Sequence, residues 1–262
     1  MNRIKKAFEN GKTFIGFITG GDPTIEKTKE FVIEMIKAGT DLIEIGIPFS
    51  DPIAEGPVIQ EASNRALAAG ATVEKVFNLI ADLRKKIAAK NLRDVPLVFL
   101  TYANPVHYLG YDAFFKRCGD VGLDGIIIPD LPFEEQAPVR DAAGKYGIDL
   151  ISLIAPTSEA RIKDIAKTAS GFIYLVSSMG VTGIRSEITT DLASITAAIK
   201  SVTQVPVAIG FGIHTPAQAK EMSRIADGVI VGSAIVKIIA EHGENAGSHI
   251  FNYVKSLKEA IV

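Results

Sequence analysis

Eight short apolar runs, separated by amphipathic stretches, constrain the fold of this 262-residue chain more than any other feature of its sequence. The runs are rich in Ile, Val, Leu and Phe and alternate little, which is typical of strands buried on both faces of a parallel sheet. They occupy residues 14–19, 42–47, 96–102, 125–130, 149–154, 171–177, 206–212 and 228–233. Helical periodicity marks the stretches between them, as in residues 24–38, 73–90, 132–146, 159–168, 192–202 and 216–224.

Strict alternation of strand and helix predicts an α/β fold with parallel pairing through right-handed crossovers. Eight such units in about 250 residues is the usual size of a (β/α)8 TIM barrel, whereas a doubly wound sheet more often has fewer strands. No linker or low-complexity tract divides the sequence. We therefore predict that residues 1–262 form a single (β/α)8 barrel domain. The segment that begins at Pro48 is longer than the other connections, which makes it a candidate functional loop.

Composition and charge exclude several classes of function. The chain has 28 basic and 30 acidic residues, so no surplus of positive charge exists to attract nucleic acid or an anionic membrane. The amino terminus lacks the apolar core of a secretory signal, and no apolar run approaches the ~20 residues that span a bilayer. We expect a cytoplasmic protein with no nucleic-acid or membrane partner.

Glu44 is the strongest candidate for a catalytic acid or base. If Ile43 and Ile45 face the surrounding helices, the two-residue period of a strand turns Glu44 into the mouth of the barrel. A carboxylate there costs several kcal/mol to bury without a partner, which favours a raised pKa and a role in proton transfer. The alternative is a structural acid in a salt bridge.

Glu55 lies in the long segment that follows, between Pro52 and the pair Gly56-Pro57, which restrict the backbone around it. A loop acid is most often simply solvated. A second carboxylate near Glu44 would, however, let one group give a proton while the other removes one.

Glycines near the ends of the last three runs favour a phosphate site. Barrel enzymes commonly bind phosphate with the loops after strands seven and eight and the N-terminus of a short helix. The backbone at Gly183, Gly212 and Gly232 could approach an anion, and Ser233 could begin the helix whose positive end faces it. Each glycine by itself could instead serve a turn. The segment 180–187 has the composition of a mobile lid.

Other side chains near strand ends could complete a pocket. Tyr174 could direct its hydroxyl into the barrel mouth, and an apolar wall could come from Phe17, Leu100, Ile126 and Phe211. Most such residues are simply part of the core, which is the alternative for each of them. The four histidines form no metal-binding pair, and neither a nucleophile elbow nor a dinucleotide glycine pattern is present. We therefore predict no metal site.

Several motifs resemble those of the tryptophan synthase alpha chain family. They run in order from about residue 14 to residue 240 and comprise Gly20-Gly-Asp-Pro, the stretch 42–57 that reads LIEIGIPFSDPIAEGP, Tyr102-Ala-Asn-Pro, Pro129-Asp-Leu-Pro-Phe-Glu-Glu, Gly180-Val-Thr-Gly and Gly210-Phe-Gly-Ile. The stretch 42–57 is long and highly specific.

The resemblance implies a (β/α)8 barrel that cleaves indole-3-glycerol phosphate to indole and glyceraldehyde 3-phosphate without a metal or cofactor of its own. It places the principal acid/base at Glu44, an acid that binds the indole N–H at Glu55, an active-site tyrosine at Tyr174 and the lid threonine at Thr182. Phosphate-binding positions match Gly183, Gly212, Gly232 and Ser233. A beta chain carrying pyridoxal phosphate is the implied partner, in an α2β2 heterotetramer.

One residue departs from the family pattern, which usually has aspartate where this chain has Glu55. The extra methylene moves the carboxylate by about 1 Å, and a misplacement of that size can cost on the order of 100-fold in rate. This departure motivates one alternative, a weakly catalytic barrel that mainly activates a beta subunit. A second alternative, a stand-alone indole-3-glycerol phosphate lyase, stays open because the sequence does not separate it from the alpha subunit.

Overall fold

The parallel strands of the chain close into a barrel. The computed structural model describes residues 2–177, 191–210 and 212–261. Within these ranges nine strands pair in the order β5-β4-β3-β2-β1-β9-β8-β7-β6. Their bounds are β1 Thr13–Thr19, β2 Leu42–Gly46, β3 Leu97–Leu100, β4 Gly125–Ile127, β5 Asp149–Leu150, β6 Ser152–Ile154, β7 Ile173–Val176, β8 Val207–Gly210 and β9 Gly228–Val231.

The two strands at the ends of this order, β5 and β6, are halves of one apolar run. They are separated by Ile151 alone, whose N–H still donates to the carbonyl of Ile126 at 2.9 Å. Because β5 pairs with β4 while β6 pairs with β7, this run joins the two edges of the sheet. The predicted (β/α)8 fold is confirmed, with its fifth strand interrupted at one residue.

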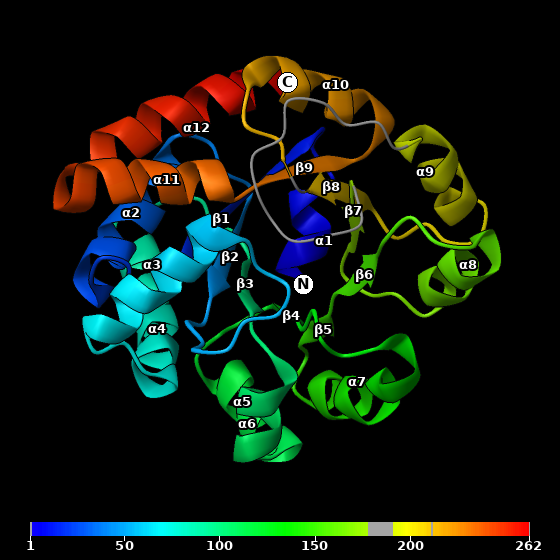
Figure 1. Cartoon of the computed structure of the whole chain (residues 1–262), viewed down its shortest axis with the longest axis horizontal. Helices are drawn as coiled ribbons and strands as arrows, with labels where there is room; N and C mark the ends of the chain where they lie inside the picture. Colours follow the sequence, from blue (N-terminus) through cyan, green and yellow to red (C-terminus); the bar gives the residue numbers. More distant parts are fainter. Residues whose placement is uncertain (1, 178–190, 211, 262) are drawn as a thin grey trace.

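Helices surround the strands, as Figure 1 shows in a view along the barrel. They are α1 Arg3–Ala7, α2 Ile25–Lys37, α3 Pro57–Ala68, α4 Val73–Ala89, α5 Ala103–Leu109, α6 Tyr111–Asp120, α7 Gln136–Lys145, α8 Glu159–Lys167, α9 Leu192–Lys200, α10 Pro216–Ile225, α11 Ser233–His242 and α12 Gly247–Ile261, with short 3-10 turns η1 Phe133–Glu135 and η2 Gly243–Asn245. No helix in the described ranges is long and apolar enough to cross a membrane.

Side-chain caps explain where several of these helices begin. The hydroxyls of Thr24, Thr72 and Ser158 each accept a hydrogen bond from a backbone N–H in the first turn of α2, α4 and α8. At α10, Thr215 forms a capping box with Gln218, and Pro216 occupies the first helical position. These local signals fix the starts of the helices that the sequence periodicity predicts.

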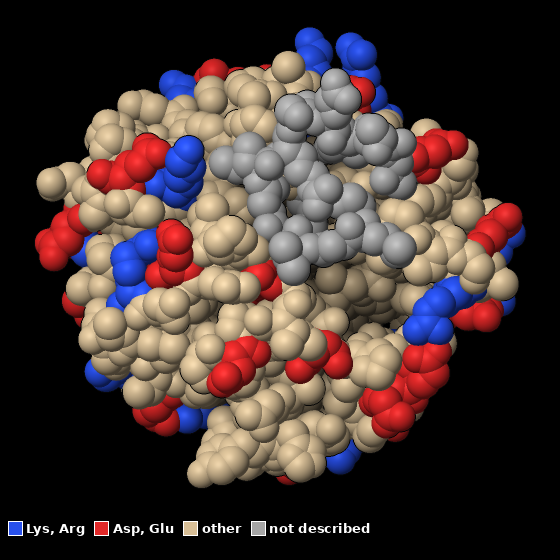
Figure 2. Space-filling view, in the orientation of Figure 1, with Lys and Arg blue, Asp and Glu red and all other residues tan. Residues whose placement is uncertain are grey.

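The surface carries mixed charge. Figure 2 shows basic and acidic side chains around the rim of this face, often next to one another, with no broad basic patch among the coloured residues. This distribution agrees with a formal net charge of −2.

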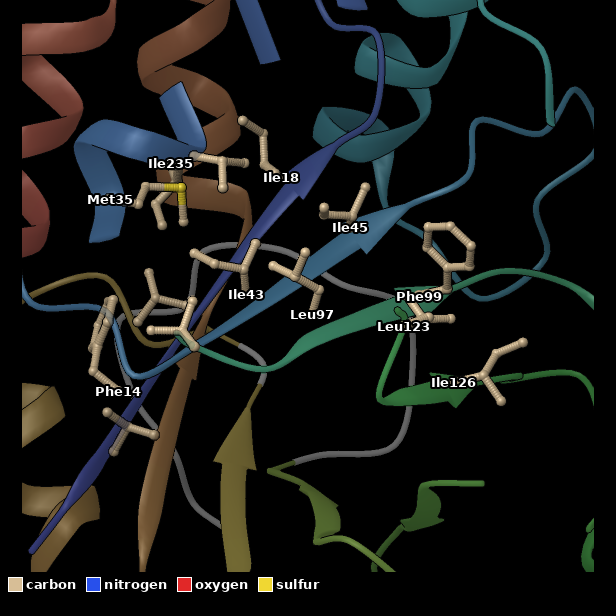
Figure 3. Close-up of a cluster of buried hydrophobic side chains, with 14 of the residues drawn as sticks. Phe14, Ile18, Met35, Ile43, Ile45, Leu97, Phe99, Leu123, Ile126 and Ile235 are labelled. Carbon is tan, nitrogen blue, oxygen red and sulfur yellow. The ribbon is translucent and has the colours of Figure 1, made fainter. Parts of the chain in front are cut away.

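The core has two layers because successive strand residues face opposite sides of the barrel wall. Side chains such as Ile43, Ile45 and Phe99 pack outward against the helices, and Figure 3 shows part of this outer layer. Leu42, Val98 and Ile127 face the interior, together with Ile4 of α1. The helix α1 therefore covers the amino end of the barrel and leaves the carboxyl end for a site.

The long connection between β2 and β3 consists of a loop, residues 47–56, followed by the helices α3 and α4. An ion pair joins α3 to the loop after β1: both carboxylate oxygens of the fully buried Asp22 accept from the guanidinium of Arg65, at 2.9 and 2.7 Å. Burial raises the pKa of Asp22, and the Arg65 charge opposes that effect. The pair fixes the helix that directly follows Glu55.

Candidate active site

A pocket opens at the carboxyl ends of the strands, where the active site of a barrel enzyme lies. It contains about 710 Å³ of space outside protein atoms, part of it open to solvent. Its walls come from strand ends and from the loops that follow them: Phe17, Glu44, Ala54, Glu55, Ile59, Leu100, Pro129, Leu153, Tyr174, Gly212, Ile213, Ile230, Gly232 and Ser233.

Glu44 reaches this pocket from the middle of β2. Its neighbours Ile43 and Ile45 pack in the outer layer, so the strand period turns the carboxyl group inward as predicted. The side chain is 1% exposed, and its Oε2 has no hydrogen-bond partner among the described residues. Burial, and secondarily the charge of Glu55, raise the pKa of Glu44 to about 8.

Glu55 enters the pocket from the end of loop 47–56. Its backbone is fixed by Gln60, whose Nε2 donates to the Glu55 carbonyl at 2.6 Å, and by Gly56, which caps α3. The residue is 7% exposed. Burial raises the pKa of its carboxyl group to about 7, while the nearby hydroxyl of Tyr102 opposes the increase.

The two acids therefore share one pocket and both titrate near neutral pH. Each group can exist in either protonation state under ordinary conditions, which is the requirement for a pair that exchanges protons with a ligand. Glu44 lines the pocket, and its buried Oε2 has hydrogen-bonding capacity that the described residues do not use.

Tyr174 lies on β7 and faces the same interior. It is 6% exposed, and burial, followed by the charge of Glu44, raises the pKa of its hydroxyl well above the ordinary value. The ring lies directly against Gly210 of the neighbouring strand β8, where an added Cβ would come within 2.6 Å of Cε1. A glycine at this position is what allows the tyrosine to occupy the pocket wall.

Gly212, Gly232 and Ser233 line the end of the pocket next to α11. Gly212 has φ of +88°, a conformation that favours glycine. Ser233 is the first residue of the ten-residue helix α11, whose free N–H groups and positive dipole end favour an anion. The other two predicted residues of this end, Thr182 and Gly183, lie outside the described residues.

The predicted apolar wall needs one correction. Phe17 and Leu100 line the pocket, and Phe211 lies outside the described residues. The prediction for Ile126 is wrong: it packs in the outer layer beside the helices, with Phe99 of the paired strand (Figure 3). The next residue, Ile127, faces the barrel interior instead.

Sequence reasoning missed several pocket residues. Two of them, Leu153 and Ile230, lie on strands, and the two-residue period could have identified them once the inward face was known. Ala54, Ile59, Pro129 and Ile213 follow strands in loops or lie at a helix start, where no period applies. Tyr102, which contacts Glu55 without lining the pocket, ends an apolar run with a hydroxyl and so carried a signal. Across the described ranges, no group of three or more His, Cys, Asp or Glu side chains is placed to bind a metal ion.

The fold and the pocket define a (β/α)8 barrel protein with two buried acids at the carboxyl ends of its strands. Residues 4–261 match the family described as tryptophan synthase alpha chain. The tryptophan synthase alpha chain of Lacticaseibacillus casei is 51% identical over 100% of this chain and 96% of its own length.

Two solved structures are similar throughout. The alpha chain from Legionella pneumophila is 35% identical with a TM-score of 0.88, covering 100% of this chain and 97% of that one. A structure of the tryptophan synthase a2b2 complex from Pyrococcus furiosus gives 33% identity and a TM-score of 0.85, covering 95% of this chain and 98% of that one. The chain belongs to the tryptophan synthase alpha chain family, whose members are lyases of tryptophan biosynthesis.

Proposed function

We propose that residues 1–262 act as one barrel domain that cleaves indole-3-glycerol phosphate to indole and glyceraldehyde 3-phosphate. The observation that carries this proposal is the pair Glu44 and Glu55, two buried acids of nearly neutral pKa in one pocket. Membership of the family supports it independently.

The reaction is a retro-aldol cleavage, and each step needs a proton moved at a defined atom. Glu44, whose pKa lies near 8, is largely protonated at neutral pH and can give its proton to C3 of the indole ring. Its carboxylate can then take the proton of the glycerol hydroxyl as the carbon–carbon bond breaks. Glu55 accepts a hydrogen bond from the indole N–H and so stabilises the positive charge that protonation places on the ring.

The remaining walls match the other parts of this substrate. The apolar side chains of Phe17, Leu100 and Leu153 suit a planar indole ring. Gly212, Gly232 and Ser233 suit a phosphate at the N-terminus of α11, and we assign Gly183 and Thr182 to the same phosphate site and its lid. Tyr174 would contact the substrate between its indole ring and its phosphate.

The chemistry proposed here uses only carboxyl groups of this chain, so we infer that it requires no cofactor of its own. Pyridoxal phosphate would belong to a beta-chain partner in the cytoplasm. The mixed surface charge, with a net charge of −2, offers no support for a nucleic-acid partner.

We infer that the partner is a tryptophan synthase beta chain, in an α2β2 assembly like the one named for the Pyrococcus furiosus structure. Three large apolar side chains are exposed on segments that follow β2 and β3: Ile53 at 73%, Tyr108 at 86% and Leu109 at 40%. We infer that these side chains contribute to the surface that contacts the beta chain. Ile53 lies two residues from Glu55, so a partner there would contact the loop that carries one of the acids.

Substitution of Glu44 tests the catalytic proposal. The Glu44→Gln variant keeps the size of the side chain but can neither give nor accept the proton, so we expect cleavage to fall at least about 1000-fold. Binding of the substrate, measured by calorimetry, should stay detectable. Glu259→Gln on α12, an exposed acid, is the matched control and should cleave normally. Full turnover by Glu44→Gln would remove this residue from the mechanism.

Indole release with and without a beta chain separates the subunit from the two alternatives. Activity that rises strongly in the mixture supports the alpha subunit, whereas high activity of the chain alone indicates a stand-alone lyase. If the chain releases no indole in either case but increases the activity of the beta chain, it is an activator.

A further inference from the structure

Tyr102 contacts the loop 47–56 at two separate places. The residue follows β3, is 1% exposed and immediately precedes α5. Its ring stacks on Phe49 near the start of the loop, with centroids 5.2 Å apart and an interplanar angle of 29°. Its hydroxyl accepts a hydrogen bond from the N–H of Ala54 near the end of the loop, at 3.1 Å. One buried side chain thus holds both ends of the loop against the barrel.

The same hydroxyl lies close to the carboxyl group of Glu55, the residue that follows Ala54, and acts to lower its pKa. A backbone N–H can only donate, so the tyrosine oxygen acts as acceptor toward Ala54 and its single proton stays available for Glu55. Burial, together with the charges of Glu55 and Asp130, raises the pKa of Tyr102 to about 12, so the hydroxyl retains this proton at all ordinary pH values. The hydroxyl therefore always has a proton to donate.

The backbone of Tyr102 is itself well fixed. The carboxylate of Asp130 accepts a hydrogen bond from the N–H of the next residue, Ala103, at 2.8 Å. The hydroxyl position is thereby set by β3 and by the loop after β4, both of which belong to the barrel wall. A glutamate side chain, in contrast, has several rotatable bonds and loses considerable freedom when it is fixed.

We propose that Tyr102 is the positioning residue of this site, and that its hydroxyl fixes the Glu55 carboxylate in the pocket by donating a hydrogen bond to it. This inference rests on the proposed function, because it assigns to Tyr102 the placement of the group that binds the indole N–H. A role in packing alone would require only the ring. The variant Tyr102→Phe keeps the stack on Phe49 and removes the hydroxyl, and with it both the donor toward Glu55 and the acceptor for the N–H of Ala54.

The first test measures the titration of Glu55 and does not depend on activity. NMR of the full chain with isotope-labelled glutamate gives the carboxyl titration, and the signal of Glu55 is the one lost in Glu55→Gln. In Tyr102→Phe the pKa of Glu55 should rise by about half a pH unit or more, because the ionised form loses a hydrogen bond. Tyr146→Phe, at the outer end of α7, is the control and should leave it unchanged. An unchanged pKa in Tyr102→Phe overturns the inference.

The second test follows cleavage of indole-3-glycerol phosphate against pH. In Tyr102→Phe we expect kcat at pH 7 to fall roughly tenfold with KM changed less than about threefold, and the acid limb to move to higher pH. In a Glu55→Gln background the same change should cause no further movement of the profile. If the wild-type chain cleaves and Tyr102→Phe retains its full profile, the inference is wrong and the proposed function stands. If the wild-type chain does not cleave, the proposed function fails, and the titration alone decides the contact between Tyr102 and Glu55.

Discussion

At the scale of single residues, the burial of Glu44 has a consequence for stability as well as for chemistry. Its folded-state pKa of about 8 lies above the ordinary value of 4.5, so the folded chain retains a proton that the unfolded chain releases between these values. Stability must therefore fall as pH rises through this range, and the whole penalty is present above pH 8. At about 1.4 kcal/mol per pH unit, the penalty is on the order of 3–5 kcal/mol.

The variant Glu44→Gln cannot ionise and should escape this penalty. We expect its free energy of unfolding in urea to decrease less between pH 6 and pH 9 than that of the wild-type chain, by about 2–3 kcal/mol. The exposed acid in Glu259→Gln serves as control and should keep the wild-type dependence. Parallel pH dependence in Glu44→Gln and wild type would show that Glu44 is ionised in the folded state at little cost.

Two residues also show when the sequence predicts which face of a strand a side chain lies on. The inward orientation of Glu44 was predictable because this polar residue lies between two isoleucines. If it faced outward, its carboxyl group would be buried in the outer core, whereas the inward face leads to the barrel mouth. The orientation of Ile126 was not predictable, because Ile126, Ile127 and Ile128 are the same residue type and the sequence does not indicate which of them faces inward. Only the pairing of β4 with β3 sets that register, and it puts Ile126 beside the outward-facing Phe99.

At the scale of elements, the packing of β7 on β8 depends on a missing side chain. Tyr174 crosses over Gly210, and a Cβ there would meet the ring at Cε1 and Cζ at 2.6 and 2.7 Å, closer than real Cβ contacts. The strand backbone cannot retreat without breaking the pairing of Val176 with Gly210. Gly210→Ala must therefore displace the tyrosine.

We expect Gly210→Ala to destabilise the chain by roughly 1–3 kcal/mol through overpacking and to lower cleavage of indole-3-glycerol phosphate, since the displaced ring enters the pocket. Urea unfolding and the cleavage assay measure the two effects. Gly144→Ala in α7 is the matched control, because an added Cβ there meets nothing within 4 Å and alanine favours a helix. Normal activity of Gly210→Ala would mean that the position of Tyr174 is not needed.

Elements were predictable where their pattern is local. The strand runs and the helices that follow them are encoded by apolar period and by caps such as Thr215. The interruption of the fifth strand at Ile151 was not predictable, because the apolar run in the sequence is continuous there. The contact of Tyr102 with Glu55 was equally hidden, because it joins residues on two different connections through the closed barrel.

At the scale of the whole molecule, stability and chemistry are assigned to opposite ends of the barrel. Near the amino ends of the strands, the buried carboxylate of Asp41 accepts hydrogen bonds from the N–H of Phe14, Nζ of Lys258 and Nη1 of Arg93, at 2.7, 2.8 and 2.6 Å. Lys258 belongs to α12 and also donates to the carbonyl of Lys12. One carboxylate thus connects the last helix of the chain to the first strand and to the segment before β3.

Asp41→Ala should therefore lower stability without affecting the site. Removing the acid leaves a buried N–H and two cations without their partner, which costs about 3 kcal/mol, near the low end for buried pairs because Arg93 is half exposed. Urea unfolding should show this loss, while kcat for indole-3-glycerol phosphate at a temperature where the variant is folded should match wild type, because the pocket lies at the other end. Lys116→Ala removes an ion pair in which both side chains are 62% exposed, and should cost less than about 1 kcal/mol. A fall in kcat of Asp41→Ala would show that strain at the amino end reaches the pocket, so that the two ends are not independent.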